Sequence, residues 1–385
     1  EASPMSNTLP DPRIHDAYLK LRMDMQDDPD SPFSRDSLYR EVQFIQRKGR
    51  RKKLRKTYTP SDSTLAKVQR TIAEIIPSFR HPAVCSYEKK DSVIRCAEVF
   101  SGCSCIGAMD ITNYFPSLTQ DVVAYTIALA LSERGNMKGD ISGFARVVAW
   151  LCTKSSPVDS GCGTAVLPLG IKPAPAISNI ACFEIDKKID AYVNERGLLF
   201  RRYSDNIYIG RRFPGRENKL DREGRAAVTA EMSAVLDDIR EIFLSTRIPG
   251  LDGPGVILQV NEEKCHIMPY WRQQRVLGVV VNDGQHAPMV SREYVRSAFS
   301  HLSSDTTDLL ADIENAYLNN QRGNIEYLTT RMRSLAREYR KTDGYLNWMS
   351  AINSDDRMRL MTQRGIVKMA LAESQRILRA IEEVK

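Results

Sequence analysis

The sequence predicts an α+β protein, on the evidence of three patterns. In the middle of the chain, short apolar runs typical of strands alternate with stretches in which apolar residues repeat at helical spacing. Two short runs, at 198–200 and 207–209, flank a polar tip and predict an antiparallel hairpin. From Ser291 onward only the helical repeat occurs. We therefore expect an α+β region followed by a helical lobe.

The individual elements follow in chain order. Residues 1–34 are polar and rich in Pro and Asp, which predicts a loosely held arm. A capped helix should begin after Pro60, and a buried strand should cover Ile106–Ile111. Further helices are expected at 120–132, 142–153, 176–194, 228–242, 325–335 and 366–381, and further strands at 256–260 and 276–281.

Composition restricts the class of protein. A chain of 385 residues exceeds what one hydrophobic core usually serves, so we expect two or three lobes. No apolar run is long enough to cross a membrane and no signal-peptide pattern occurs, so we expect a cytoplasmic protein with no membrane partner. The eight cysteines lack metal-binding spacing, which predicts reduced thiols and no structural zinc.

The positive charge is concentrated in one run. Residues 47–56, RKGRRKKLRK, hold eight Lys or Arg, so of the net charge of +7 the rest of the chain carries 7 − 8 = −1. Such a patch suits a polyphosphate partner, either nucleic acid or nucleotide, and its nucleic-acid-binding candidates are Arg50, Arg51, Lys52 and Lys53. A solvated charge run or a localisation signal would have the same composition.

Two carboxylates stand where strands give way to turns. Asp110 lies near the end of the predicted strand, in GAMDITNYFPSL (107–118), and Asp205 lies at the hairpin tip in RRYSDNIYIG (201–210). Each alone is better explained by a turn or a helix cap than by a metal, because Asp tolerates the backbone of tight turns. Brought together, they would supply oxygen ligands for the divalent ions of phosphoryl transfer.

Five segments occur in a recognisable order. They are AMDITNYFPSL, LPLGIKPAPAISN (167–179), YSDN (203–206), LQVNEEKCHI (258–267) and RVLGVVVN (275–282). This series resembles that of reverse transcriptases, in particular the bacterial retron-type and group II intron-type enzymes. The run RKKLRKTYTPSDSTLAKVQRTI resembles their fingers, and GYLNWMSAINSDDRMRL (344–360) resembles the end of their thumb. The resemblance covers about residues 35–365.

The resemblance implies a right-hand polymerase fold. It would comprise an N-terminal arm (1–34), fingers (35–104), a palm with an antiparallel sheet (105–284, with 120–175 partly fingers), and a helical thumb with a C-terminal extension (285–385). The implied activity is RNA-directed DNA polymerisation by two-metal nucleotidyl transfer with Mg²⁺, or alternatively Mn²⁺. The implied partners are an RNA template, expected to be a noncoding RNA, dNTPs, the DNA product, and an effector protein or second reverse transcriptase.

The resemblance also assigns roles to individual residues. The catalytic set would be Asp110, Asp205, Asn206 and Lys264, with metal ligands from Asp110, the Ile111 carbonyl and Asp205. The nucleotide-binding set would be Arg55, Lys56, Phe115, Leu169 and Gly170, in which the Phe115 ring would exclude a ribose 2′-hydroxyl and Lys264 would protonate the leaving pyrophosphate. The competing interpretation is a core aromatic for Phe115 and an ordinary surface lysine for Lys264.

Two positions depart from the family pattern. Asn206 stands where the family usually has a second Asp, and Leu169 stands where it usually has Gln. They motivate a rival interpretation, a polymerase-like subunit without chemistry that binds nucleic acid or a partner polymerase. A template-independent or protein-primed polymerase is a further alternative. The chain ends soon after the thumb-like segment, so we expect no nuclease or integrase domain, as in a domesticated enzyme of anti-phage defence.

Overall fold

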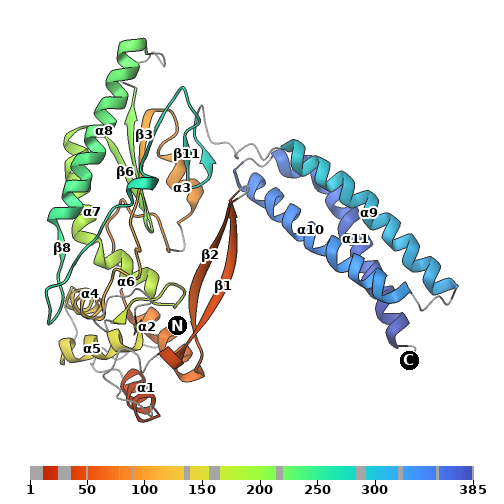
Figure 1. The fold of residues 1–385 in the computed structure, drawn as a ribbon, viewed down its shortest axis with the longest axis horizontal. Helices are drawn as coiled ribbons and strands as arrows, with labels where there is room; N and C mark the ends of the chain where they lie inside the picture. The colour runs from red at the N-terminus through yellow and green to blue at the C-terminus, as the bar shows by residue number, and fades with distance from the viewer. Residues whose placement is uncertain are drawn as a thin grey trace, which may run out of the picture. The chain divides into compact units, whose positions relative to one another are not determined.

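The computed structural model describes residues 12–24, 36–48, 51–77, 79–88, 91–133, 139–155, 165–213, 220–282, 292–319, 324–352 and 355–383. The chain divides into two compact units, Glu1–Arg272 (unit 1) and Gln273–Lys385 (unit 2). Figure 1 labels their helices and strands and colours the chain by residue number. Unit 1 mixes helices with small antiparallel sheets, and unit 2 is mainly helical. This is the α+β composition predicted from the sequence, with its helical lobe.

A four-stranded antiparallel sheet lies at the centre of unit 1. Its strands are β3 (Cys103–Asp110), β6 (Leu199–Tyr203), β7 (Asn206–Arg212) and β10 (His266–Pro269), in the order β10-β3-β7-β6. Helices α7 (Phe183–Glu195) and α8 (Arg222–Ser245) cover one face, as Figure 1 shows. All of β3 is buried, and a Cβ at Gly107 would lie 2.8 Å from the Leu236 side chain of α8. The small residue therefore permits close packing of strand and helix.

The described residues of unit 1 form further helices. They are α1 (Pro12–Met23), α2 (Ser63–Ile75), α3 (Val93–Glu98), α4 (Gln120–Ser132), α5 (Ile141–Leu151) and α6 (Ala174–Ala181), with short 3₁₀ turns η1 (Asp36–Leu38) and η2 (Glu262–Lys264). The predicted cap of α2 is confirmed, because the Asp62 carboxylate accepts hydrogen bonds from the N–H groups of Thr64 and Leu65.

Three small two-stranded sheets also occur among the described residues of unit 1. The largest is the hairpin of β1 (Tyr39–Lys48) and β2 (Arg51–Pro60), which contains most of the basic run. The others pair β4 (Lys154–Ser155) with β5 (Ala165–Val166), and β8 (Arg247–Ile248) with β9 (Val256–Ile257).

Some sequence predictions were wrong in detail. The expected arm contains α1, which buries Ile14, Ala17 and Leu21. The expected helix 176–194 is two helices, because the backbone at Cys182 (φ −86°, ψ 0°) leaves the helical region. The strand expected at 256–260 is only two residues long, with Val260 in a separate bridge to Ile111.

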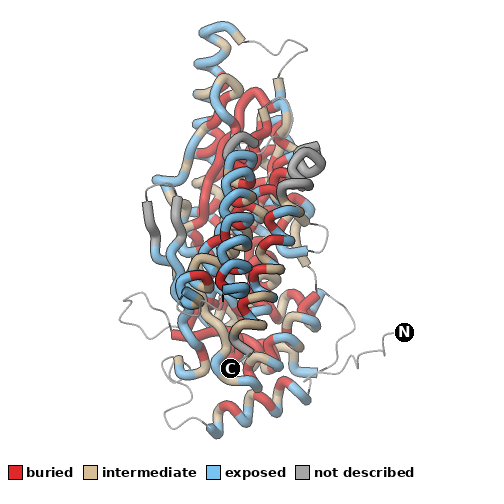
Figure 2. Tube along the Cα trace, turned by 90° about the vertical axis from the view of Figure 1, so that its right-hand side faces the viewer, coloured by how far each residue is buried: buried red, intermediate tan, exposed pale blue. Residues whose placement is uncertain are grey.

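Unit 2 has its own hydrophobic core. Helices α9 (Arg292–Leu318), α10 (Ile325–Ile352) and α11 (Asp355–Glu383) pack on one another around residues such as Phe299, Leu309 and Leu346. Buried and exposed positions alternate along these helices (Figure 2). The strand expected at 276–281 is instead a tight hairpin of β11 (Arg275–Val276) and β12 (Val279–Val280), whose turn residues Leu277 and Gly278 have positive φ.

No helix in the described ranges is long and apolar enough to cross a membrane. Among the described thiols, Cys96, Cys105, Cys152 and Cys182 are buried and form no disulfide.

Candidate functional site

The end of β3 and the β6–β7 turn bring five of the predicted site residues together. Asp110 is the last residue of β3 and lies opposite Asn206, the first residue of β7. Asp205 occupies the turn, and its carbonyl accepts a hydrogen bond of 2.9 Å from the Ile111 N–H. Lys264, in η2, reaches across with its Nζ 2.5 Å from Asp110 Oδ1. Residues 95 positions apart in the sequence thus share one edge of the sheet.

The electrostatics of this cluster centre on Asp205. Burial raises the pKa of the Asp205 carboxyl, and the nearby negative charge of Asp110 raises it further, while the cations Lys264 and Arg55 oppose the shift. The Asn206 amide Nδ2 donates a 2.8 Å hydrogen bond to Asp205 Oδ1. The amide therefore orients the carboxylate without adding a second negative charge.

The donor set suits a hard divalent cation. Asp110 and Asp205 offer carboxylate oxygens, and Asp110 is close enough to Asp205 for its charge to raise the pKa of that carboxyl. Mg²⁺ is commonly held by one or two carboxylates plus water and substrate phosphates. Within the described ranges there is no group of three or more His, Cys, Asp or Glu side chains that could hold a metal. A metal here would therefore depend on this pair, completed by backbone, water or substrate oxygens.

The turn is held by a buried side chain, Arg202, which was not among the predicted site residues. Arg202 is 1% exposed and pairs with Asp186 of α7 through two hydrogen bonds of 2.7 Å. Its Nη1 donates to the Ser204 carbonyl at 2.9 Å and to the Tyr114 hydroxyl at 2.8 Å. Burial opposes the charge, but the Asp186 carboxylate raises the pKa of Arg202 well above its usual value. Arg202 thus ties the turn before Asp205 to a helix and to the segment after β3.

A second support comes from the segment 83–87, which also went unrecognised. Val84 forms a parallel bridge with Arg202, through hydrogen bonds that involve Ala83 and Cys85. The Tyr87 hydroxyl donates to Ser204 Oγ at 2.7 Å, and Ser86 Oγ accepts from the Ser204 N–H at 3.2 Å.

The backbone of Ser204 explains why this support is needed. Ser204 has φ 59° and Tyr87 has φ 73°, both in the left-handed region, which is unfavourable for residues other than Gly, Asn and Asp. No local sequence signal marks either residue, since their contact joins positions 117 apart in the chain.

Two of the predicted nucleotide-binding residues, Leu169 and Gly170, lie beside β2. Gly170 (φ +114°) lies against β2, where a Cβ would come 2.6 Å from the Tyr58 carbonyl oxygen, and the Tyr58 N–H donates to the Leu169 carbonyl at 2.8 Å. The close backbone approach seen at Gly170 is thus to this hairpin. Leu169 is 40% exposed.

The cations of β2 have different surroundings. Arg55 is close enough to Asp205 to stabilise its carboxylate, whereas the Lys56 ammonium lies 3.1 Å from Glu41 of β1. Phe115 is buried, at 8% exposure, and its ring packs edge-on against Tyr114 with centroids 5.1 Å apart. The Arg51, Lys52 and Lys53 side chains and all of Arg50 lie outside the described structure.

Comparison with known proteins adds independent information. No protein-family model matches the chain. Over 199 residues it is 27% identical to the retron Ec86 reverse transcriptase of Escherichia coli, an alignment that covers 51% of this chain and 56% of the relative. Over 225 residues it is 24% identical to the retron Mx162 reverse transcriptase of Myxococcus xanthus, which covers 56% of this chain and 42% of the relative. The chain thus spans about half the length of the curated relatives it matches.

Both relatives are reverse transcriptases, which confirms the resemblance found in the ordered motifs. Within that class, the chain is similar to the retron-type enzymes.

Proposed function

We propose that this protein is an RNA-directed DNA polymerase with a right-hand fold. In this proposal residues 35–104 form the fingers, 105–284 the palm with 120–175 partly in the fingers, and 285–385 the thumb and C-terminal extension. The observation that carries the proposal is the proximity of Asp110 and Asp205 where β3 ends beside the β6–β7 turn, so that the charge of Asp110 raises the pKa of Asp205. The similarity to retron reverse transcriptases supports it.

The chemistry follows from the residues at that edge. Asp110, Asp205 and the Ile111 carbonyl would hold Mg²⁺ or Mn²⁺, which when bound activates the primer 3′-hydroxyl and stabilises the leaving pyrophosphate. Asn206 orients the Asp205 carboxylate through its amide. Lys264, held at Asp110, would carry the proton that neutralises the leaving group.

Substrate recognition belongs to the neighbouring segments. Arg55 and Lys56 of β2 would bind the phosphates of the incoming dNTP, and Leu169 and Gly170 would border it. The ring of Phe115 would disfavour a ribose 2′-hydroxyl. The basic run containing Arg50, Arg51, Lys52 and Lys53 would follow the phosphates of an RNA template, for which we propose a noncoding RNA. We further propose a role in anti-phage defence, with an effector protein or a second reverse transcriptase as partner. The proposed location is the cytoplasm.

Incorporation of labelled dNTPs tests the activity. Asp110→Ala and Asp205→Ala should each reduce incorporation by at least about a hundredfold with Mg²⁺, because either change removes a metal ligand. Asp237→Ala removes an exposed aspartate of α8 and should leave the rate unchanged. An Asp205→Ala protein that keeps half of the wild-type rate would refute the assignment.

The amide at Asn206 favours one alternative, a polymerase-like subunit without chemistry. We expect wild-type activity in Mg²⁺ and higher activity in Mn²⁺, with no gain from Asn206→Asp, since that change replaces a hydrogen bond to Asp205 with a second negative charge. A wild-type protein that is inert with every nucleotide and metal but rescued by Asn206→Asp would establish the alternative.

A further inference from the structure

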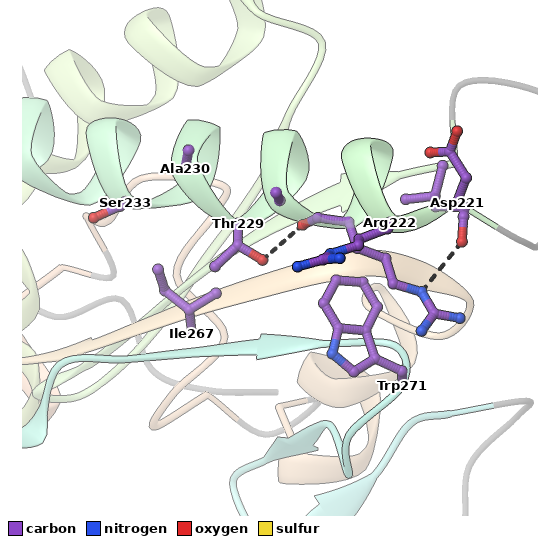
Figure 3. Close-up of a pocket in the computed structure, with 10 residues that line it drawn as sticks. Asp221, Arg222, Thr229, Ala230, Ser233, Ile267 and Trp271 are labelled. Atoms are coloured by element: carbon purple, nitrogen blue, oxygen red, sulfur yellow. Dashed lines mark hydrogen bonds between the residues drawn. The ribbon is translucent and has the colours of Figure 1, made fainter.

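A surface pocket in unit 1 lies away from the carboxylate pair and has no role in the proposed chemistry. It has a volume of about 810 Å³ and lies between the first half of α8 and the residues around the end of β10. Figure 3 shows Thr229, Ala230 and Ser233 along the helix, with Ile267 and Trp271 facing them. The small side chain of Ala230 leaves the space open. A volume of this size accommodates a small organic ligand.

One wall of the pocket is an aromatic face held in place. Trp271 is half-buried and packs edge-on against Tyr270, with ring centroids 5.2 Å apart. The Arg225 guanidinium carbon lies 5.3 Å from the Trp271 ring centroid, and Arg225 Nε donates to the Leu220 carbonyl at 3.1 Å. The ring is thereby fixed on one side, and Ile267 extends the apolar surface beside it.

The rim of the pocket carries net positive charge. Arg222 and Arg225 both line it and are exposed. The lining carboxylate, Asp221, accepts a 2.7 Å hydrogen bond from the Gly224 N–H as the cap of α8, so its charge is partly offset by the helix end. Hydroxyl groups of Thr229 and Ser233 add neutral hydrogen-bonding partners.

We propose that this pocket binds one unpaired nucleotide of the RNA, with the base on Trp271 and the phosphate at Arg222. Single-stranded RNA is recognised chiefly by stacking of unpaired bases on aromatic or guanidinium planes and by cations along the backbone. The Trp271–Arg225 pair and the Arg222 charge supply both elements in one cavity. The proposal rests on the proposed function, because it assigns a second contact for the same RNA outside the site of synthesis.

Binding of the full chain to a fluorescein-labelled twelve-residue oligouridylate, without divalent ions, tests the proposal. Trp271→Ala and Arg222→Gln should each raise the dissociation constant about tenfold, since one stacked base or charge contact is lost. Arg222→Gln should also lower the slope of log K against log salt by about 0.7, whereas Trp271→Ala should leave the slope unchanged. Trp271→Phe keeps an aromatic face and should retain most of the affinity.

The chain offers a matched control. Arg196 lies over the Tyr192 ring at 3.8 Å on another part of unit 1, so Arg196→Gln removes the same charge and a similar contact and should not change RNA affinity. The same RNA carrying 5-iodouridine should crosslink to the peptide that contains Trp271. Crosslinking elsewhere, with Trp271→Ala and Arg222→Gln within twofold of wild type, would overturn the proposal.

Polymerase activity is measured separately on a preannealed primer–template. If the enzyme is active but its RNA affinity does not change on substitution of Trp271 or Arg222, the proposed nucleotide pocket is refuted and the proposed polymerase function is not. An inactive protein whose RNA affinity depends on both residues supports the pocket and refutes the polymerase.

Discussion

At the scale of single residues, the proposed metal ligand Asp205 lowers the stability of the folded protein. Burial and the charge of Asp110 raise the pKa of Asp205, so its ionised form disfavours the folded state at neutral pH. Asp205→Asn should therefore raise the melting temperature at pH 7 by about 2 °C, while synthesis is lost. The gain should disappear below the ordinary value of 3.8, where the wild-type carboxyl is protonated in both the folded and unfolded states.

The same variant reports metal binding without activity. Because an ion that binds only the folded protein stabilises it by mass action, added Mg²⁺ should raise the melting temperature of the wild type and much less that of Asp205→Asn. Equal responses in calorimetry would mean that Asp205 does not bind the ion.

At the scale of elements, the β6–β7 turn depends on the ion pair of Arg202 with Asp186. Arg202→Met should cost about 3–5 kcal/mol, because it leaves Asp186 buried without its partner. The double variant Arg202→Met with Asp186→Leu should recover much of this stability. Its kcat should stay low with little change in KM, since the Ser204 carbonyl still lacks its donor. Recovery of both stability and kcat would limit Arg202 to a structural role.

A second element, the β1–β2 hairpin, depends on Gly170. Gly170→Ala combines an unfavourable φ of +114° with a Cβ 2.6 Å from the Tyr58 carbonyl oxygen, so it should destabilise the protein by about 1–3 kcal/mol and raise KM for dNTPs. Gly102→Ala is the control, because Gly102 has φ +72° with open space around it. If thermal unfolding shows equal losses for both variants, the contact with β2 contributes nothing.

At the scale of the whole molecule, the two hydrophobic cores should unfold separately. Leu131 is buried in the core of unit 1 and Leu309 in that of unit 2. Either residue changed to Ala should cost about 2–5 kcal/mol, and in calorimetry each change should lower a different transition. A single transition that both variants lower would contradict this expectation.

The sequence predicted those features of the fold and site that leave a local or ordered trace. The strand that ends at Asp110, the hairpin around Asp205 and most helices have clear apolar spacing. The order of the motifs resembles that of reverse transcriptases, and this resemblance predicted that the two carboxylates belong to one site. The break between α6 and α7 at Cys182 has no Gly or Pro at that position, so no local residue type predicts it. The roles of Arg202 and Tyr87 arise from partners distant in the sequence. The sequence alone does not distinguish a buried arginine from an exposed one.

The bridge between Val84 and Arg202 also bears on how the chain avoids self-association. In the described sheet β6 is an outer strand, and an outer strand offers unpaired N–H and C=O groups to which another chain can add. The segment around Val84 occupies part of that edge. The opposite outer strand, β10, ends in Pro269, which has no N–H to donate. Proteolytic cleavage that releases the Val84 segment would therefore expose the outer edge of β6. The strand that precedes Asp205 would then become a site at which another chain can pair and aggregation can begin.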